Sequence, residues 1–369
     1  MPKLRFALGR RLPNRGLAGR IRRKQLGAAS GVADSLRSFI ADGLGRQRFI
    51  TQGSDCLSWL SEFHYANGEV LVKKTGTILR LDKALRGDIF AWLVFYAAVQ
   101  SLPIGAWMRV RRAPKLAFAP DRPRPWYLAW PVLKAAGVRM VRDAAKADIV
   151  FHFDDSTDTS AVALPAPAPK ARTINYHCRD VSKTRVGVVF EAVFGYPLAV
   201  DPRSFSGAMV EKSEKNGAHD GRIVQGPLEP LPNRTYQRVI DNSMAPQNGR
   251  EILVEDLRTP MIWGQPALVF RKRRNISRRF ANDNVDCVLA RPEEVFSHEE
   301  IAKLCAFAAA LGLDWGGLDV LRDRADGRIY IVDANKTDMG PPISLPLADK
   351  LKAIKILARA FNDRAVQPL

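Results

Sequence analysis

The sequence predicts an α+β fold in which a large C-terminal unit follows a small α/β domain and a basic, mostly helical N-terminal extension. The chain has 369 residues, enough for two or three domains, and with 46% apolar and 26% charged residues it is typical of a folded protein. Its second half combines long β-rich stretches with interspersed helical patterns. These observations divide the chain into residues 1–115, 116–200 and 201–369.

The extension is strongly basic at its start. Residues 1–24 contain nine Lys and Arg and no acidic residue, within a chain whose 57 basic and 38 acidic residues give a formal charge of +19. Such an arm is attracted to an anionic membrane surface, and a solvated tail is the alternative. Nucleic acid is disfavoured as a partner because no reading module or aromatic platform accompanies the arginines. Four scattered cysteines and the lack of a secretory signal predict a cytoplasmic location.

An uncharged segment, Ile89–Met108, closes the extension. It is long enough to cross a bilayer, but Pro103 and Gly105 interrupt it and basic residues flank both ends. A helix buried in the protein that breaks near Pro103 is the favoured interpretation, and a helix lying on a membrane surface is the alternative. Together with the basic arm, the alternative predicts attachment at the inner face of a membrane without a span.

The middle block has α/β character. The proline-rich stretch 119–131 marks its boundary, because so many prolines exclude a regular helix or central strand. Residues 147–153 (ADIVFHF) predict a buried strand, and residues 182–194 predict a helix that ends before Gly195.

The last block contains the clearest helix signals. Ser297 and Glu300 form a capping-box pattern before an apolar helical face, and Gly312 supplies the stop. We expect a C-terminal helix to be buried through five side chains: Leu347, Leu351, Ile354, Leu357 and Phe361.

Residues 318–335 predict a β-hairpin that carries two opposed carboxylates. A turn at Ala325-Asp326-Gly327 would pair Arg324 with Arg328, and counting back five residues on each strand places Asp319 opposite Asp333. Asn335 falls on the same face. Two carboxylates this close require a proton or a cation between them, and a set of oxygen ligands is what Mg²⁺ prefers. A register shifted by one residue, with Asp319 facing solvent, is the alternative.

This region resembles the ATP-grasp superfamily, specifically its glutathione-synthetase-like branch of carboxylate–amine ligases. The resemblance lies in LGLDWGGLDVLRDRADGRIYIVDANKTDMGPP, where a helix leads into a GLDxxGxDVL-like run, a hairpin and a DxN ending. It implies a catalytic unit of two subdomains, with ATP as cosubstrate. It also implies that Asp319, Asp333 and Asn335 hold Mg²⁺ against the ATP phosphates, with Asp333 in place of the usual glutamate.

Upstream segments resemble the family in the same order. VEKSEKNGAHDG (210–221) is similar to its phosphate-binding lysine and flexible loop, which implies nucleotide contacts from Lys212, Gly217 and His219. TYQRVID (235–241) is similar to the segment that reads adenine, which implies Gln237 and Val239. EDLRTPMIWGQPALVFRKRR (255–274) is similar to its strand pair with catalytic cations: Arg258, and either Lys272 or Arg273.

The resemblance implies a ligase that forms an acyl-phosphate from a carboxylate and couples it to an amine. The substrates would be small molecules or lipid- or glycan-linked precursors. Two alternatives stay open: a kinase of the same fold that phosphorylates a hydroxyl, and a non-catalytic protein that binds a membrane or nucleic acid. Neither a Walker loop nor a GxGxxG fingerprint after a strand is present.

Overall fold

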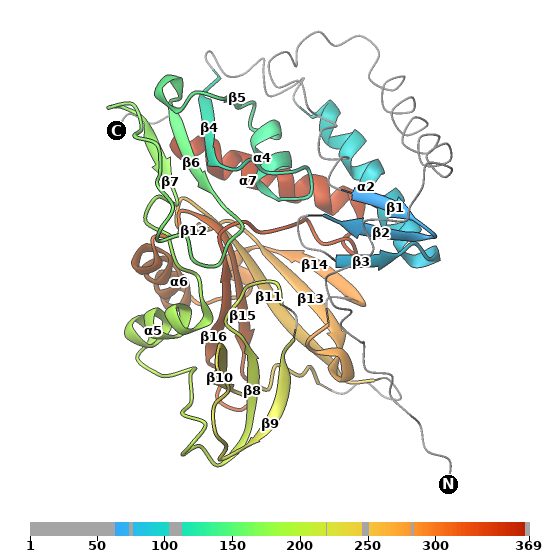
Figure 1. Ribbon diagram of the computed structural model, residues 1–369, viewed down its shortest axis with the longest axis vertical. Helices are drawn as coiled ribbons and strands as arrows, with labels where there is room; N and C mark the ends of the chain where they lie inside the picture. Colours follow the sequence, from blue (N-terminus) through green and yellow to red (C-terminus); the bar gives the residue numbers. More distant parts are fainter. Residues whose placement is uncertain are drawn as a thin grey trace, which may run out of the picture. The chain divides into compact units, whose positions relative to one another are not determined.

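A computed structural model describes residues 63–73, 77–102, 113–218, 220–245, 251–281 and 284–365 (Figure 1). The chain divides into two compact units, Met1–Asp82 and Lys83–Leu369, and each is described by itself. The basic arm, residues 1–24, lies outside the described residues, as do residues 103–108 of the apolar segment.

The described part of the first unit is a three-stranded antiparallel sheet of order β1-β2-β3. Its strands are β1 (Phe63–Ala66), β2 (Glu69–Val72) and β3 (Thr77–Arg80). Asn67 and Gly68 both have positive φ, 52° and 78°, as a two-residue hairpin turn requires. The prediction of a mostly helical extension did not include this sheet, although the Asn-Gly pair between two apolar runs is a hairpin signal.

The second unit begins with α2 (Lys83–Ser101), which packs against α4 (Ala129–Ala135) and α7 (Leu347–Ala365). Phe95, Tyr96 and Val99 are buried, and Tyr96 stacks on Trp130 with ring centroids 5.1 Å apart. The helix is therefore buried along one face, and it ends two residues before Pro103, in agreement with the favoured interpretation. Its opposite face leaves Phe90 68% exposed. Among the described residues, none of the helices combines the length and the apolar character that a bilayer crossing needs.

A four-stranded parallel sheet of order β5-β4-β6-β7 follows. The strands are β4 (Lys115–Pro120), β5 (Arg139–Val141), β6 (Ile149–Phe153) and β7 (Arg172–Ile174), with a 3₁₀ turn η2 (Ala144–Lys146). All five residues of β6 are buried, which confirms the predicted strand and explains its continuous apolar run.

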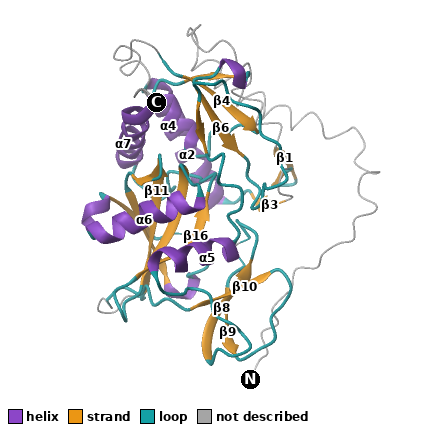
Figure 2. Cartoon of the chain, turned by 90° about the vertical axis from the view of Figure 1, so that its left-hand side faces the viewer, coloured by secondary structure: helices purple, strands orange, loops and turns teal. Residues whose placement is uncertain are grey.

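Two antiparallel sheets form the rest of the unit (Figure 2). The small sheet, of order β10-β8-β9, comprises β8 (Gly207–Ser213), β9 (Arg222–Gly226) and β10 (Arg234–Arg238). The large sheet has the order β14-β13-β11-β15-β16, with β12 beside β11. Its strands are β11 (Leu253–Ile262), β12 (Gln265–Pro266), β13 (Val269–Asn275), β14 (Asp286–Ala290), β15 (Trp315–Arg322) and β16 (Ile329–Asn335).

Helices α5 (Lys183–Phe194) and α6 (His298–Leu311) share a core with the large sheet, in which Phe190 and Phe307 pack with Leu318 and Ile331. The predicted boundaries are confirmed. Ser182 caps α5, Ser297 and Glu300 form the capping box of α6, and Gly195 and Gly312 end the two helices at positive φ. The 3₁₀ turns η3 (Ile276–Arg278) and η4 (Pro292–Glu294) complete this region.

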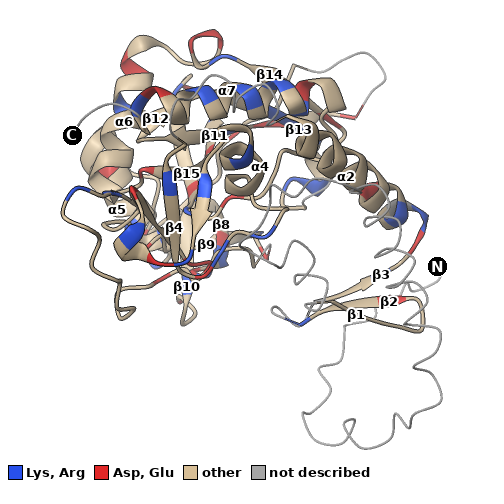
Figure 3. Ribbon diagram, turned by 90° about the horizontal axis from the view of Figure 1, so that it is seen from above, with Lys and Arg blue, Asp and Glu red and all other residues tan. Residues whose placement is uncertain are grey.

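The C-terminal helix α7 buries Ile354, Leu357 and Phe361 completely, as predicted, whereas Leu351 is half-buried and Leu347 is exposed. Lys352, Lys355 and Arg359 of this helix are exposed, and Figure 3 shows basic residues at several points along α7. The α+β prediction is thus confirmed: sheets of both kinds and separate helices surround two main cores.

Candidate active site

The β15–β16 hairpin places two carboxylates on one face of the large sheet. Asp319 pairs with Asp333 across the hairpin, and Gly317 pairs with Asn335. Paired residues of antiparallel strands project to the same side, so Asn335 shares this face with both carboxylates. Each aspartate side chain remains 25% exposed, so a ligand can approach both groups from solvent.

The predicted opposition of Asp319 and Asp333 is confirmed, but the hairpin reaches it by a different route. Asp323, not Arg324, lies opposite Arg328, with a backbone hydrogen bond of 2.9 Å, and Arg322 pairs with Ile329. That register alone would place Asp319 opposite Val332. An irregularity between Asp319 and Val320 leaves Val332 without a partner and shifts the pairing by one residue. A β-bulge therefore restores the opposition that the turn by itself would miss.

Two cations hold Asp319. Arg258 lies opposite it on β11 and donates from Nη1 to Oδ2 at 2.9 Å, and the Nζ atom of Lys272 on β13 lies 3.5 Å from Oδ1. Partial burial works to raise the pKa of Asp319, but the guanidinium and the ammonium outweigh it and hold that pKa well below its usual range. Asp319 is therefore ionised throughout the physiological pH range.

The absence of a side chain at Gly317 leaves room for the Arg258 side chain. A Cβ atom at Gly317 would lie 2.6 Å from the Cζ, Nε and Nη2 atoms of Arg258, closer than real Cβ contacts allow. A larger residue at this position of β15 would force the guanidinium to shift from its place beside Asp319.

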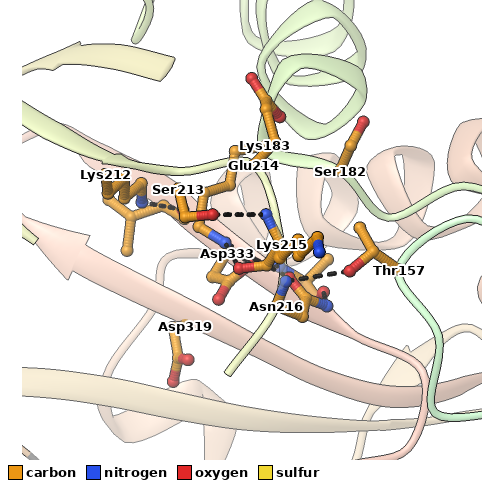
Figure 4. A network of polar contacts seen from close by, with 12 residues as sticks. Thr157, Ser182, Lys183, Lys212, Ser213, Glu214, Lys215, Asn216, Asp319 and Asp333 are labelled. Atoms are coloured by element: carbon orange, nitrogen blue, oxygen red, sulfur yellow. Dashed lines mark hydrogen bonds and ion pairs between the residues drawn. The ribbon is translucent and has the colours of Figure 1, made fainter. Parts of the chain in front are cut away.

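Two lysines approach Asp333 from other elements (Figure 4). Lys183, in the first turn of α5, is buried and places Nζ 3.9 Å from Oδ1 of Asp333. Lys212 of β8 donates from Nζ to the Val332 carbonyl at 2.7 Å. Burial raises the pKa of Asp333, with a further contribution from Asp319, while Lys183 and Lys212 act against the rise. The pKa of Asp319 is therefore lowered, whereas the pKa of Asp333 is raised.

The ammonium of Lys212 is itself poorly accommodated. Burial and the nearby Lys183 lower its pKa to about 8, and the attraction of Asp333 and Asp319 compensates only in part. Because charges attract one another more strongly in a buried environment than in water, a bound anion stabilises a buried ammonium more than it stabilises a solvated one.

The loop between β8 and β9 folds over the hairpin. The Asn216 side chain donates to the Ala334 carbonyl at 3.2 Å, and the Asn216 backbone N–H donates to the Thr157 hydroxyl at 3.0 Å (Figure 4). Gly217 has a φ of +70°, which suits glycine in this turn. His219 lies outside the described residues.

The proposed adenine-reading residues lie beside Lys212. Thr235 pairs with Lys212 and Gln237 pairs with Val210, so Gln237 and Lys212 share a face of the small sheet. Gln237 is buried, and Val239 lies one residue beyond β10.

Arg273 lies apart from the carboxylates. It alternates with Lys272 along β13 and binds Glu255 at 2.9 Å and Asp286 at 3.2 Å. Of the two alternatives for the distal cation, the geometry brings only Lys272 to the site.

Lys183, which lies at the site, and Asn175, which supports the start of β15, were not singled out from the sequence. Lys183 could have been suspected from its place directly after a helix cap, where its charge has no local purpose. Asn175 is fully buried at a φ of +59°. Its side chain accepts from the Asp314 and Trp315 backbone N–H groups, each at 2.9 Å, and donates to the Trp315 carbonyl at 2.6 Å. It ties the end of β7 to the start of β15.

The arrangement is suited to a polyanion and a small divalent cation. Four cationic side chains surround the aspartate pair: Lys183, Lys212, Arg258 and Lys272. No group of three or more His, Cys, Asp or Glu side chains suitable for a metal occurs in the described ranges. Asp319, Asp333 and Asn335 together could hold a cation that takes two carboxylates and an amide and completes its shell with water or phosphate oxygens, as Mg²⁺ does.

Comparisons with known proteins give no family from sequence. No family model matches the chain, and no curated protein matches it. Among solved structures, the ATP-grasp ligase PsnB in complex with a minimal precursor, Mg and ADP is 13% identical, with 66% of this chain and 98% of that chain covered and a TM-score of 0.41.

Two further ligases are matched at a similar level. An L-amino acid ligase from Bacillus licheniformis is 11% identical, with 70% and 76% covered and a TM-score of 0.39. A D-alanine–D-alanine ligase from Bacillus anthracis is also 11% identical, with 69% and 98% covered and a TM-score of 0.40. At these scores the likeness carries no weight for function, which has to be argued from the residues and their geometry.

Proposed function

We propose that this chain is an ATP-grasp enzyme that uses ATP and Mg²⁺ to activate a carboxylate and join it to an amine. The observation that carries the proposal is the aspartate pair, Asp319 and Asp333, opposed on one open face and surrounded by four cations from three parts of the unit. The three upstream segments that resemble the ATP-grasp superfamily, residues 210–221, 235–241 and 255–274, follow one another in the order found in that family, which supports the same assignment.

The phosphates of ATP would lie between the small sheet and the hairpin. Lys212 and Lys183 would neutralise them, and Gln237, on the same face as Lys212, would read the adenine with the backbone near Val239. The loop around Gly217 would cover the phosphates, because it already contacts the hairpin through Asn216. His219, in the same loop, stays part of the proposal.

Asp319, Asp333 and Asn335 would hold Mg²⁺, whose bound charge offsets that of the transferring phosphoryl group. Asn335 fits this role because its Oδ1 is already fixed by the Thr337 backbone N–H at 2.9 Å, which orients the amide oxygen.

The chain's own groups suit the two steps of the reaction. An oxygen of the substrate carboxylate attacks the γ-phosphorus, the bond to the β-phosphate oxygen breaks, and ADP leaves. Arg258 and Lys272 would neutralise the transferring group, a role for which fixed cations suffice without a general base. The amine nitrogen then attacks the acyl carbon, phosphate leaves, and the nitrogen loses a proton. Arg273, which faces Glu255 and Asp286, would take no part.

The test is ADP release from purified full-length protein with Mg²⁺-ATP and a panel of carboxylates, with and without an amine. Hydroxylamine serves as a general amine, because it converts an acyl-phosphate into a hydroxamate. Hydroxamate formation that depends on ATP and a carboxylate supports the ligase. ADP release that depends on an alcohol and yields a phosphate ester would identify a kinase instead, and no ATP binding by calorimetry would contradict both.

The basic arm and α2 also bear on where the enzyme works and on the class of its substrate. We propose that the enzyme works in the cytoplasm at the inner face of a membrane, on an envelope-related or glycan-linked substrate. Nine basic residues in 1–24 and the exposed apolar residues Ile89 and Phe90 of α2 support this. Removal of residues 1–24 should lower binding to anionic vesicles at low salt and leave ATP hydrolysis unchanged. Equal binding by the full and shortened chains would refute the role of the arm.

A further inference from the structure

The loop between β8 and β9 is tied to the first turn of α5 by one acidic side chain. The Glu214 carboxylate accepts a hydrogen bond of 3.1 Å from the Thr184 backbone N–H and one of 2.6 Å from the Thr184 hydroxyl. The first turn of α5 has no acidic residue of its own, and Ser182 caps it through the Arg185 N–H. A carboxylate is favoured at this end of a helix, where the N–H groups and the helix dipole are positive. Glu214 therefore adds to the cap of a helix that lies thirty residues earlier in the chain.

Three more contacts hold the same loop in one position. Lys183 donates from Nζ to the Lys215 carbonyl at 3.2 Å (Figure 4). The Asn216 backbone N–H donates to the Thr157 hydroxyl at 3.0 Å, and its side chain donates to the Ala334 carbonyl at 3.2 Å. These partners come from the loop after β6, from α5 and from β16. The place of the loop beside the hairpin is therefore fixed by the chain's own groups.

The bond between Glu214 and Thr184 lies nearest to solvent. Thr184 is exposed and Glu214 is half-buried, whereas Lys183 and Ala334 are buried. A bond at the surface opens at low cost, because water replaces the partners that separate. Strand β8 ends at Ser213, which is still paired with β10, so the loop can swing outward from Glu214 while the strand stays in its sheet.

We propose that Glu214 is a positioning residue whose bond to Thr184 latches the β8–β9 loop over the phosphate site, so that nucleotide enters and leaves when this latch opens. The inference rests on the proposed function, which places the ATP phosphates under this loop. The latch contains no atom of the nucleotide. It therefore slows entry and exit together, because it lowers the fraction of molecules with an open loop in the free and in the bound protein alike.

The proposal predicts a kinetic signature for Glu214→Ala. The association and dissociation rate constants of ADP should both rise by about fivefold, the factor that corresponds to the loss of one hydrogen bond, and Kd should stay within about twofold of wild type. A residue that contacts phosphate, as proposed for Lys212, would instead raise Kd when it is replaced. Stopped-flow fluorescence measures both rate constants with full-length protein, Mg²⁺ and ADP that carries an N-methylanthraniloyl group.

A second variant tests whether Thr184 is the partner through which Glu214 acts. Thr184→Val keeps the shape of the side chain and the backbone N–H but removes the hydroxyl that binds Glu214. It should raise both rate constants in the same direction as Glu214→Ala and to a smaller extent. In the double variant Thr184→Val/Glu214→Ala we expect no rise beyond that of Glu214→Ala alone, because the two changes remove one shared contact.

Ser182→Ala provides a matched control. Ser182 caps the same end of α5, accepting from the Arg185 N–H at 3.3 Å, but this bond lies within the helix and does not involve the loop. The control should lower the urea unfolding midpoint, as the loss of a helix cap does, and leave both rate constants unchanged. It separates the latch from a general loosening of α5.

Trypsin cleavage after the exposed Lys215 reports the opening of the loop without nucleotide. Thr184→Val is the variant for this measurement, because its substitution leaves the sequence around the cleaved bond unchanged. Cleavage at this bond, followed by mass spectrometry, should be about threefold faster than in the wild type, since the open loop is more populated.

Unchanged ADP rate constants in Glu214→Ala, an equal rise in Ser182→Ala, or unchanged cleavage in Thr184→Val would each overturn the inference. Faster cleavage with unchanged ADP kinetics would overturn it as well, because the contact would then hold the loop without governing nucleotide exchange. A failure of the proposed function looks different. In that case the wild-type protein would not bind the fluorescent ADP at all, although Thr184→Val would still be cleaved faster.

Discussion

Replacing Lys212 with Met should stabilise the nucleotide-free protein while weakening ATP binding. The folded-state pKa of Lys212 is about 8 against an ordinary 10.5, so the charged form is disfavoured by 2.5 pKa units in the folded protein. At 1.36 kcal/mol per unit this corresponds to about 3 kcal/mol at pH 7. Partial exposure of the side chain makes that figure an upper bound. Loss of the hydrogen bond to Val332 offsets about 1 kcal/mol, which leaves a net gain of about 2 kcal/mol.

The pH dependence of this gain has a defined sign. A lysine whose folded pKa is depressed destabilises the protein fully below that pKa, and the penalty disappears as the pH rises to the unfolded value. The advantage of Lys212→Met should therefore be greatest below pH 8, shrink as the pH rises, and turn into a loss of about 1 kcal/mol toward pH 10.5, where only the missing hydrogen bond counts. Urea unfolding between pH 6.5 and pH 10, with the fold checked by circular dichroism, measures it.

The effect of Lys212→Met on ATP binding is measured by calorimetry with a non-hydrolysable ATP analogue. Loss of a charge-assisted bond to phosphate should weaken binding by about 2 kcal/mol. Lys215→Met is the matched control: the side chain of Lys215 is exposed in the same loop, so both quantities should change little. A Lys212→Met protein destabilised equally at every pH would refute the reasoning, because the ammonium would then be favourably bound without nucleotide.

Three further predictions address the rest of the site. Asp333→Ala should abolish ATP turnover and leave the unfolding midpoint near wild type, since removing one of two opposed carboxylates does not disrupt the hairpin; normal ADP production would contradict the metal assignment. Residues 213–221 should be cleaved by protease in the free protein and protected by ATP, and equal cleavage in both states would exclude a phosphate lid. Asn175→Ala should destabilise the protein by about 3 kcal/mol or more in urea unfolding, because the Trp315 backbone loses its buried partners; a change within 1 kcal/mol would show that water replaces them.

The sequence predicted those helix boundaries and strands that are determined by residues close together in the chain. The capping box of Ser297 and Glu300, the stop at Gly312 and the buried strand β6 all follow from interactions within a few residues, and all are confirmed. The candidate cations were named through the resemblance of residues 255–274 to a family strand pair, which implied Arg258 and left Lys272 and Arg273 as alternatives. The structure places Lys272, not Arg273, beside Asp319.

The register of the β15–β16 hairpin could not be predicted in full from local sequence patterns. The turn was expected at a pairing one residue away from the observed one, and the bulge that leaves Val332 unpaired was not expected either. The two deviations cancel at Asp319 and Asp333, so the conclusion was right although the route was wrong. A bulge is set by tertiary contacts, here including the lysine that binds the Val332 carbonyl, and these contacts are not visible in the strand's own sequence.

The partners of Lys183 and Asn175 could not be predicted for a related reason, although the place of Lys183 directly after a helix cap was a hint. Each acts on residues more than a hundred positions away: Lys183 reaches Asp333, and Asn175 binds Trp315. Only the packing of the parallel sheet and α5 against the hairpin gives them a role, and a pattern within one segment carries no information about that packing.

The same packing links the β8–β9 loop to the parallel sheet. The Thr157 hydroxyl, on the loop after β6, accepts from Asn216 of the β8–β9 loop at 3.0 Å, and Asp155 on the same loop accepts from Thr337 directly after the hairpin. In parallel α/β sheets, ligands bind outside the carboxyl ends of the strands, which is where this loop begins. A substrate held there would therefore touch the segment that contacts both the proposed phosphate loop and the end of β16, which carries the proposed metal ligands. We expect substrate and nucleotide to bind with positive coupling, so that ATP cleavage without a carboxylate is slow; Thr157→Val should weaken that coupling, measured as the ratio of ATP affinities with and without substrate, while leaving the ATP affinity of the substrate-free protein within about threefold of wild type.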